Sequence, residues 1–178
     1  MKKNYHLSPF SHLVFIVSIC FFSSVYITSF GQSFEKFKPY LDKGNDICES
    51  NPDSALFYFN QALDLVTPKD SNSLARIYNR KAQAYSMKGE YTISADFSFK
   101  SLKLASFFKD TIALIDANNN LGIDLMYQKN YKASLDYFYL VAKLASSSRD
   151  SLRLGHAYNN IGLTLGYAGD TKAELENY

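Results

Sequence analysis

Histidine and cysteine are scarce in this chain, which has 3 histidines and 2 cysteines among 178 residues. Most of them lie between Met1 and Gly31, and the remainder has only His156 and Cys48. A single cysteine forms no internal disulfide. One histidine and one cysteine also supply too few ligands for a Cys/His zinc site. Cys48 is therefore expected to be a core residue.

The short motifs of common enzyme and nucleotide sites are missing as well. There is no GxSxG elbow, no P-loop, no GxGxxG turn and no HExxH helix. Acidic residues are plentiful, but Asp64 and Asp96, for example, are expected to be surface charges rather than a catalytic pair. No group of residues offers a nucleophile, a base and an orienting side chain together. We therefore expect neither enzymatic activity nor a cofactor.

An excess of positive charge is absent from most of the chain. The formal net charge is +2, and Lys2 and Lys3 supply it, because the other 17 basic residues balance the 17 acidic ones. Proteins that bind nucleic acids neutralise phosphates with a basic surface. We therefore expect no nucleic-acid partner.

Residues 1–31 differ in composition from the rest of the chain. A polar, basic start precedes the apolar and uncharged run 13–30, and small residues stand at Ser29 and Gly31. This order predicts a secretory signal peptide that is cleaved after Gly31, and hence export to the periplasm, the cell envelope or the outside. The alternative is a retained membrane anchor, because a span needs at least about 17 apolar residues. Residues 13–30 would then be the only membrane contact.

Within the remaining segment, residues 32–178, three copies of a pattern keep a 40-residue step, so that position 69 corresponds to positions 109 and 149, whereas the step to the first helix slips to 38 residues. A basic residue, an aspartate and a hydroxyl residue recur at 69–71, 109–111 and 149–151. A small residue recurs at Ala82, Gly122 and Gly162. Such self-similarity indicates a solenoid. Glycine in a helix costs about 0.8–1 kcal/mol relative to alanine, so its recurrence predicts a close approach of two helices that offsets the cost.

Each repeat unit is predicted to be a pair of antiparallel helices. Apolar residues recur at i, i+3, i+4 and i+7 after Asp, Ser or Thr, which are good N-cap residues. Four units are expected, at 34–66, 71–107, 110–147 and 150–178, the first degenerate and the last incomplete. Their helices are predicted at 34–49, 52–66, 71–88, 91–107, 110–128, 131–147, 150–168 and from 171 to the end.

Three copies of one residue pattern resemble the tetratricopeptide repeat. The first copy has Tyr78, Ala82, Tyr85, Gly89, Tyr91 and Leu102, and the next two contain Leu121-Gly122 and Ile161-Gly162. The resemblance implies an all-α superhelix (an α-solenoid) of helix pairs whose first helices line a concave groove, and a role in binding other proteins. The family's usual period is about 34 residues. The longer step seen here gives each helix room for about one more turn of 3.6 residues, as in the longer units of bacterial regulatory repeat proteins.

The pattern stops at Tyr178, within the predicted second helix of the fourth unit. The end of a solenoid normally has a capping helix with a polar outer face, so we expect a longer natural chain. In the repeat proteins that this chain resembles, a coiled coil and a DNA-binding or histidine-kinase output often follow. The resemblance thus supports a second hypothesis, in which the repeats are the sensory part of a signalling protein anchored by residues 13–30.

Polar residues recur on the first helix of each unit and are the candidate groove residues. Asn79, Asn119 and Asn159 share one register, and Arg80, Asn120 and Asn160 share the next. In the family's geometry they would form ladders whose amides suit an extended peptide backbone. Arg76, Arg80 and Gln83 would add recognition of carboxylates, with His156 exposed nearby. We therefore predict that the groove binds a peptide or protein segment. For Asn120 and Asn160 the alternative is a structural bridge between neighbouring helices.

Overall fold

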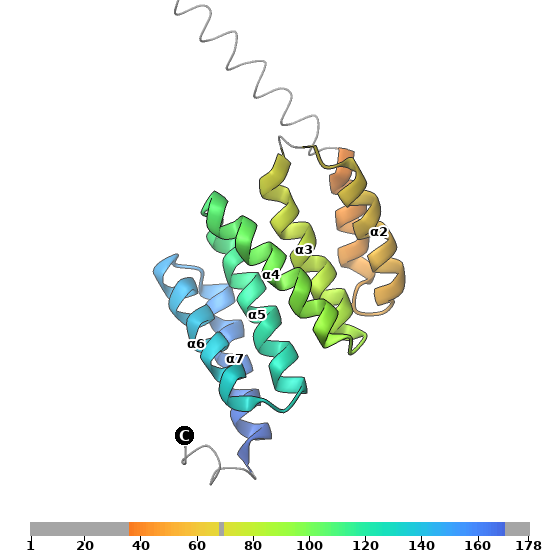
Figure 1. Ribbon diagram of the computed structural model, residues 1–178. Helices are drawn as coiled ribbons and strands as arrows, with labels where there is room; N and C mark the ends of the chain where they lie inside the picture. Colours follow the sequence, from red (N-terminus) through yellow and green to blue (C-terminus); the bar gives the residue numbers. More distant parts are fainter. Residues whose placement is uncertain (1–35, 68–69, 170–178) are drawn as a thin grey trace, which may run out of the picture.

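The computed structural model describes residues 36–67 and 70–169 (Figure 1). A first helix covers residues 36–47. It is followed by α2 (Pro52–Leu65), α3 (Ser71–Met87), α4 (Tyr91–Phe108), α5 (Thr111–Tyr127), α6 (Tyr131–Ser147) and α7 (Ser151–Tyr167). The ends of these helices agree to within about two residues with those predicted from capping residues and periodicity. The predicted leader and the predicted helix from residue 171 lie outside the described residues.

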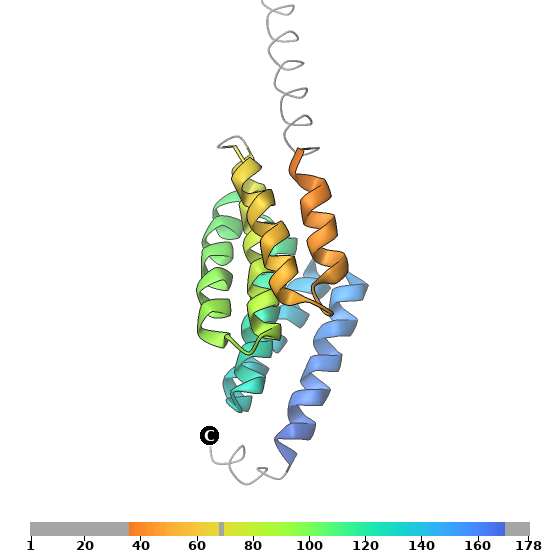
Figure 2. The same cartoon turned by 90° about the vertical axis from the view of Figure 1, so that its right-hand side faces the viewer.

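Consecutive helices pack antiparallel, so the described chain is an all-α helical-repeat array of seven helices. In addition, α3 contacts α5, and α5 contacts α7. The first helix, α3, α5 and α7 are called the A helices below, and α2, α4 and α6 the B helices. Figure 2 shows the array edge-on, with α4 on one side and the first helix and α7 on the other.

One turn geometry recurs at each connection from α3 to α7. Gly89, Lys109, Lys129 and Arg149 have φ values of 76, 56, 64 and 58°. In each turn the next residue donates its backbone N–H to the carbonyl five positions earlier, at 2.9 Å, which satisfies a free carbonyl at the helix end. Where this next residue is Asp110, Asn130 or Asp150, its side chain also caps the following helix. One turn therefore ends one helix and begins another.

The two helices of a unit approach each other most closely at the small residues. A Cβ atom added to Gly122 would lie 2.6 Å from Cε1 of Phe138, and one added to Gly44 would overlap Phe59. Both phenylalanines are fully buried. The close approach predicted at Gly122 is therefore confirmed. The predicted partner of Gly162 lies outside the part of the chain that the structure describes.

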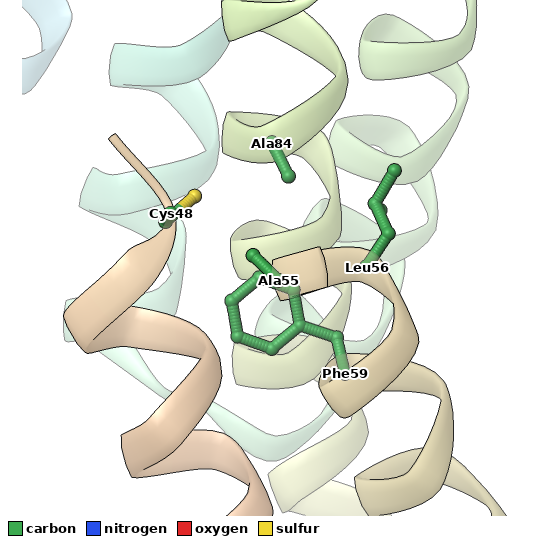
Figure 3. Packing of buried hydrophobic residues seen from close by; sticks show 5 residues of the cluster. All are labelled: Cys48, Ala55, Leu56, Phe59 and Ala84. Atoms are coloured by element: carbon green, nitrogen blue, oxygen red, sulfur yellow. The ribbon is translucent and has the colours of Figure 1, made fainter. Parts of the chain in front are cut away.

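The core is a series of small clusters, each built from consecutive helices. In the cluster of Figure 3, Cys48, which directly follows the first helix, and Ala84 of α3 pack with Phe59 of α2, and Ala55 and Leu56 lie beside it. Cys48 is 3% exposed, which confirms the prediction that it is a core residue. Burial also raises the pKa of its thiol, so the side chain stays neutral at physiological pH.

We expect Gly122→Ala to destabilise the fold, although alanine is the better helix former. The new methyl group would collide with Phe138, and overpacking costs about 1–3 kcal/mol. Gly155→Ala is the matched control, because no described atom lies within 4 Å of the added Cβ. This control should stabilise the protein by about 1 kcal/mol. Urea unfolding followed by circular dichroism compares the two, and equal stabilisation would contradict the close approach.

Candidate functional site

A cavity of about 880 Å³ opens on the side of the A helices. Glu49 and residues of α3, α5 and α7 form most of its lining. Six of the nine predicted groove residues line it, namely Asn79, Arg80, Gln83, Asn119, Asn120 and His156. Arg76, Asn159 and Asn160 do not. This cavity is called the groove below.

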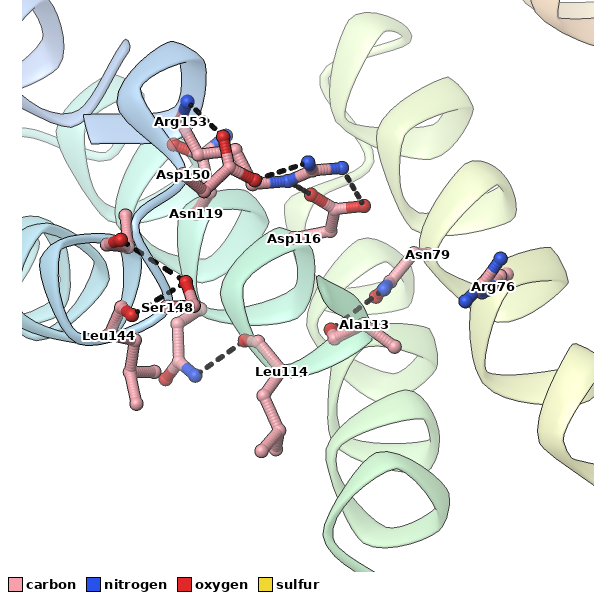
Figure 4. A network of polar contacts seen from close by, with 12 residues as sticks. Arg76, Asn79, Ala113, Leu114, Asp116, Asn119, Leu144, Ser148, Asp150 and Arg153 are labelled. Atoms are coloured by element: carbon pink, nitrogen blue, oxygen red, sulfur yellow. Dashed lines mark hydrogen bonds and ion pairs between the residues drawn. The ribbon is translucent and has the colours of Figure 1, made fainter. Parts of the chain in front are cut away.

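Buried asparagines join neighbouring A helices beneath the groove. Nδ2 of Asn79 donates to the Ala113 carbonyl of α5 at 2.9 Å (Figure 4). Nδ2 of Asn120 donates in the opposite direction, to the Asn79 carbonyl of α3, at 3.0 Å. The two side chains are 4% and 8% exposed. This corrects the expectation that Asn79 is exposed in the groove, because its amide is used to hold α5 against α3.

The same kind of bridge joins α5 to α7, but here both ends are side chains. Nδ2 of Asn160 donates to Oδ1 of Asn119 at 2.9 Å. The bridging alternative therefore describes both Asn120 and Asn160. Asn159 is exposed and lies outside the groove lining, whereas the partly buried Asn119 belongs to it.

Ion pairs connect the same helices near their N-termini. Nε of Arg76 lies 3.1 Å from Oδ2 of Asp110. Arg153 contacts Asp116 and Asp150, each at 2.8 Å (Figure 4). The hydrogen bonds from the Arg153 backbone N–H and guanidinium lower the pKa of Asp150. Arg76 and Asp116 occupy equivalent positions of successive units. This position therefore supplies the basic partner of the ion pair between α3 and α5, and the acidic partner of the pair between α5 and α7.

Arg80, Gln83 and Asn119 leave hydrogen-bond donors without a partner among the described residues. Nη1 of Arg80 donates to Oε1 of Gln83 at 3.0 Å, which occupies the glutamine oxygen and leaves its NH₂ group. The Asn119 oxygen is likewise occupied by Asn160, which leaves the Asn119 NH₂ group. Arg80 makes no ion pair with any residue that the structure describes, unlike Arg76 and Arg153. The groove therefore offers N–H donors and fits hydrogen-bond acceptors.

The sequence prediction missed the apolar part of the lining. Met87, Ile123, Tyr127 and Leu152 all contribute to it. Met87 and Tyr127 share one register of the repeat, and Gln83 and Ile123 share another. These positions continue the helical face that begins at Arg76, so the repeat period itself was a usable signal.

The described segments contain no group of three or more His, Cys, Asp or Glu side chains that could hold a metal ion. None of their helices is long and apolar enough to span a bilayer. His156 is exposed at the groove and belongs to no group of three or more such side chains among the described residues.

Asp124 is a buried carboxylate on α5, behind the groove. It is 1% exposed. Burial raises its pKa, and the Ser86 and Ser94 hydroxyls, which favour the charged form, offset this only in part. Neither carboxylate oxygen has a described hydrogen-bond partner of good geometry. The charged form of Asp124 therefore opposes folding.

We expect Asp124→Asn to stabilise the protein at pH 7. Because the pKa is raised in the folded state, the stabilising contribution of this group is present below about pH 4 and is lost as the pH rises through the folded-state pKa. Each unit of upward shift corresponds to about 1.4 kcal/mol. Urea unfolding between pH 4 and 8 should show a difference between the variant and the wild type that grows with pH. A difference independent of pH would contradict the effect.

Asn120→Ala should lower the free energy of unfolding by about 1–2 kcal/mol, because it removes a buried hydrogen bond between α3 and α5. Asn159→Ala is the control, since this exposed residue should change stability by less than about 0.5 kcal/mol. Thermal melting of both variants distinguishes a structural bridge from a surface amide. Equal melting temperatures would show that the bridge adds no stability.

Comparison with models of known protein families finds no match to this chain, and no curated protein is significantly similar to it. The helical-repeat array is thus established by its own geometry. The arguments about function depend on the groove and on the surface of the array.

Proposed function

We propose that the protein is a non-catalytic scaffold of the tetratricopeptide-repeat type that binds a peptide or protein segment in the groove. The main support is the juxtaposition, in a cavity of about 880 Å³, of N–H donors that lack a described partner with the apolar side chains of Met87 and Ile123. An extended segment presents carbonyl acceptors along its backbone and apolar side chains between them. Both kinds of group would find a partner in the groove.

The bridges beneath the groove favour this function because they fix its shape before a partner arrives. Asn79 and Asn120 each donate to a backbone carbonyl of the neighbouring A helix. Arg153 holds the start of α7 against Asp116 of α5. A site that is already ordered loses less conformational entropy on binding, which leaves more of the contact energy as affinity.

We further propose export to the cell envelope through residues 1–31, read as a signal peptide. A second candidate function is favoured by the uncharged run 13–30, which is long enough for a short anchor. In that case the repeats are the sensory region of a membrane-anchored signalling protein. The groove would serve both functions in the same way, and the mass of the native chain distinguishes a cleaved from a retained leader.

Selection from a random peptide library displayed on phage tests the groove. Peptides selected on the wild-type protein should bind Arg80→Ala/Gln83→Ala about 10- to 100-fold more weakly, since the variant loses hydrogen bonds that include a charged donor. These two side chains bond each other rather than a neighbouring helix, so melting should hardly change. Asn159→Ala should bind like the wild type. Selected peptides that bind both variants equally, or a selection that yields none, would contradict the proposal.

A further inference from the structure

The side of the array opposite the groove carries exposed aromatic side chains. On α4, Phe99 and Phe107 are 54% and 78% exposed. On α6, Tyr139 and Leu140 are 53% and 41% exposed. These residues do not line the groove. Exposed apolar groups gathered among charged ones mark an interaction surface.

Exposed basic side chains lie on the same two helices and at their C-terminal ends. The exposed bases are Lys100, Lys103 and Lys109 from α4 and its end, with Lys143 and Arg149 from α6 and its end. No acidic residue occurs at 97–109 or 137–149, and Asp96, Asp110, Asp136 and Asp150 directly flank these two segments. The five bases make no ion pair with any residue in the described ranges. Together with Phe99, Phe107, Tyr139 and Leu140, they are called the outer patch below.

The repeat period places the same kinds of residue at equivalent positions of two helices. Phe99 and Tyr139 occupy equivalent positions, as do Lys103 and Lys143. The helices that carry them, α4 and α6, run in the same direction (Figure 1). Along α4, positions 99, 103 and 107 are related by i, i+4 spacing and lie on one face. An exposed aromatic residue followed four positions later by an exposed lysine therefore occurs at the same place on α4 and on α6.

The composition of the outer patch indicates a lipid surface rather than a protein. Four of its five bases are lysines, whose ammonium groups act as point charges, whereas bidentate recognition of carboxylates uses arginine. Long basic side chains and aromatic rings on one face are typical of elements that lie on the interface of an anionic bilayer. We propose that the outer patch docks on the surface of a membrane containing anionic lipids. The A helices, which form most of the groove lining, would then lie on the side of α4 away from the bilayer.

The full chain contains no tryptophan, so a single introduced indole reports on one position. In Phe107→Trp, the fluorescence emission should shift to shorter wavelength with vesicles of phosphatidylcholine and phosphatidylserine, and stay unchanged with phosphatidylcholine alone. Tyr127→Trp, at an exposed position that lines the groove, should show no shift with either. Because the signal comes from position 107, insertion of residues 13–30 would not imitate it.

Charge-reversal variants distinguish the effect of the outer-patch lysines from the effect of the net charge of the protein. In the Phe107→Trp background, Lys100→Glu/Lys103→Glu should raise the lipid concentration for half-maximal shift at least tenfold. Lys43→Glu/Lys129→Glu makes the same change in net charge elsewhere and should have much less effect. The proposal would be overturned if Phe107→Trp showed no shift with anionic vesicles, or the same shift with neutral ones. It would also be overturned if Tyr127→Trp shifted as much as Phe107→Trp, or if the two charge-reversal pairs weakened binding equally. Phe99→Trp repeats the measurement if Phe107→Trp loses helicity.

Discussion

The turn that recurs at each connection from α3 to α7 determines the rest of this structure. Gly89, Lys109, Lys129 and Arg149 reverse the chain in the same way and are spaced 20 residues apart, so the helices between them have nearly the same length, 17 or 18 residues. Residues one full unit apart consequently face the same direction. The contact between Asn79 and Asn120 depends on this register, and so does the alignment of Phe99 with Tyr139.

Local chemistry explains how much of the fold the sequence could predict. N-cap residues and apolar periodicity depend on near neighbours in the chain, so the helix ends and the close approach at Gly122 were predicted well. The burial of Asn79 was not predicted, because its side-chain amide can form a hydrogen bond with water, a partner or a neighbouring carbonyl with similar strength. The distance between α3 and α5 decides among these, and no periodicity encodes that distance. Positive φ at Lys109 and Arg149 was equally hidden, since lysine and arginine show no preference for that conformation.

The two faces of the array use polar side chains differently. On the A helices, Arg76 and Arg153 are neutralised by aspartates, and the groove presents amides beside the Arg80 guanidinium, which has no described ionic partner. On α4 and α6, the lysines of the outer patch stand without described acidic partners beside exposed rings. The directional hydrogen bonds of the groove suit a partner of defined shape, such as a peptide. The dispersed positive charge of the outer patch suits a surface without a fixed arrangement of acceptors, such as a lipid bilayer. The groove and the outer patch thus lie on opposite helices of the same pairs, and each has its own chemistry.

The bridges between A helices also give the array an uneven mechanical character. Two hydrogen bonds donated in opposite directions join α3 and α5, and each ends on a backbone carbonyl. Sliding or splaying these helices would stretch both bonds at once, so they behave as one stiff block. Between α5 and α7, the Asn160–Asn119 bond and the Arg153–Asp116 pair run from side chain to side chain. Rotation about several single bonds lets such ties follow small movements without breaking. We therefore expect the array to bend mainly between α5 and α7, which would change the width of the groove at its His156 end.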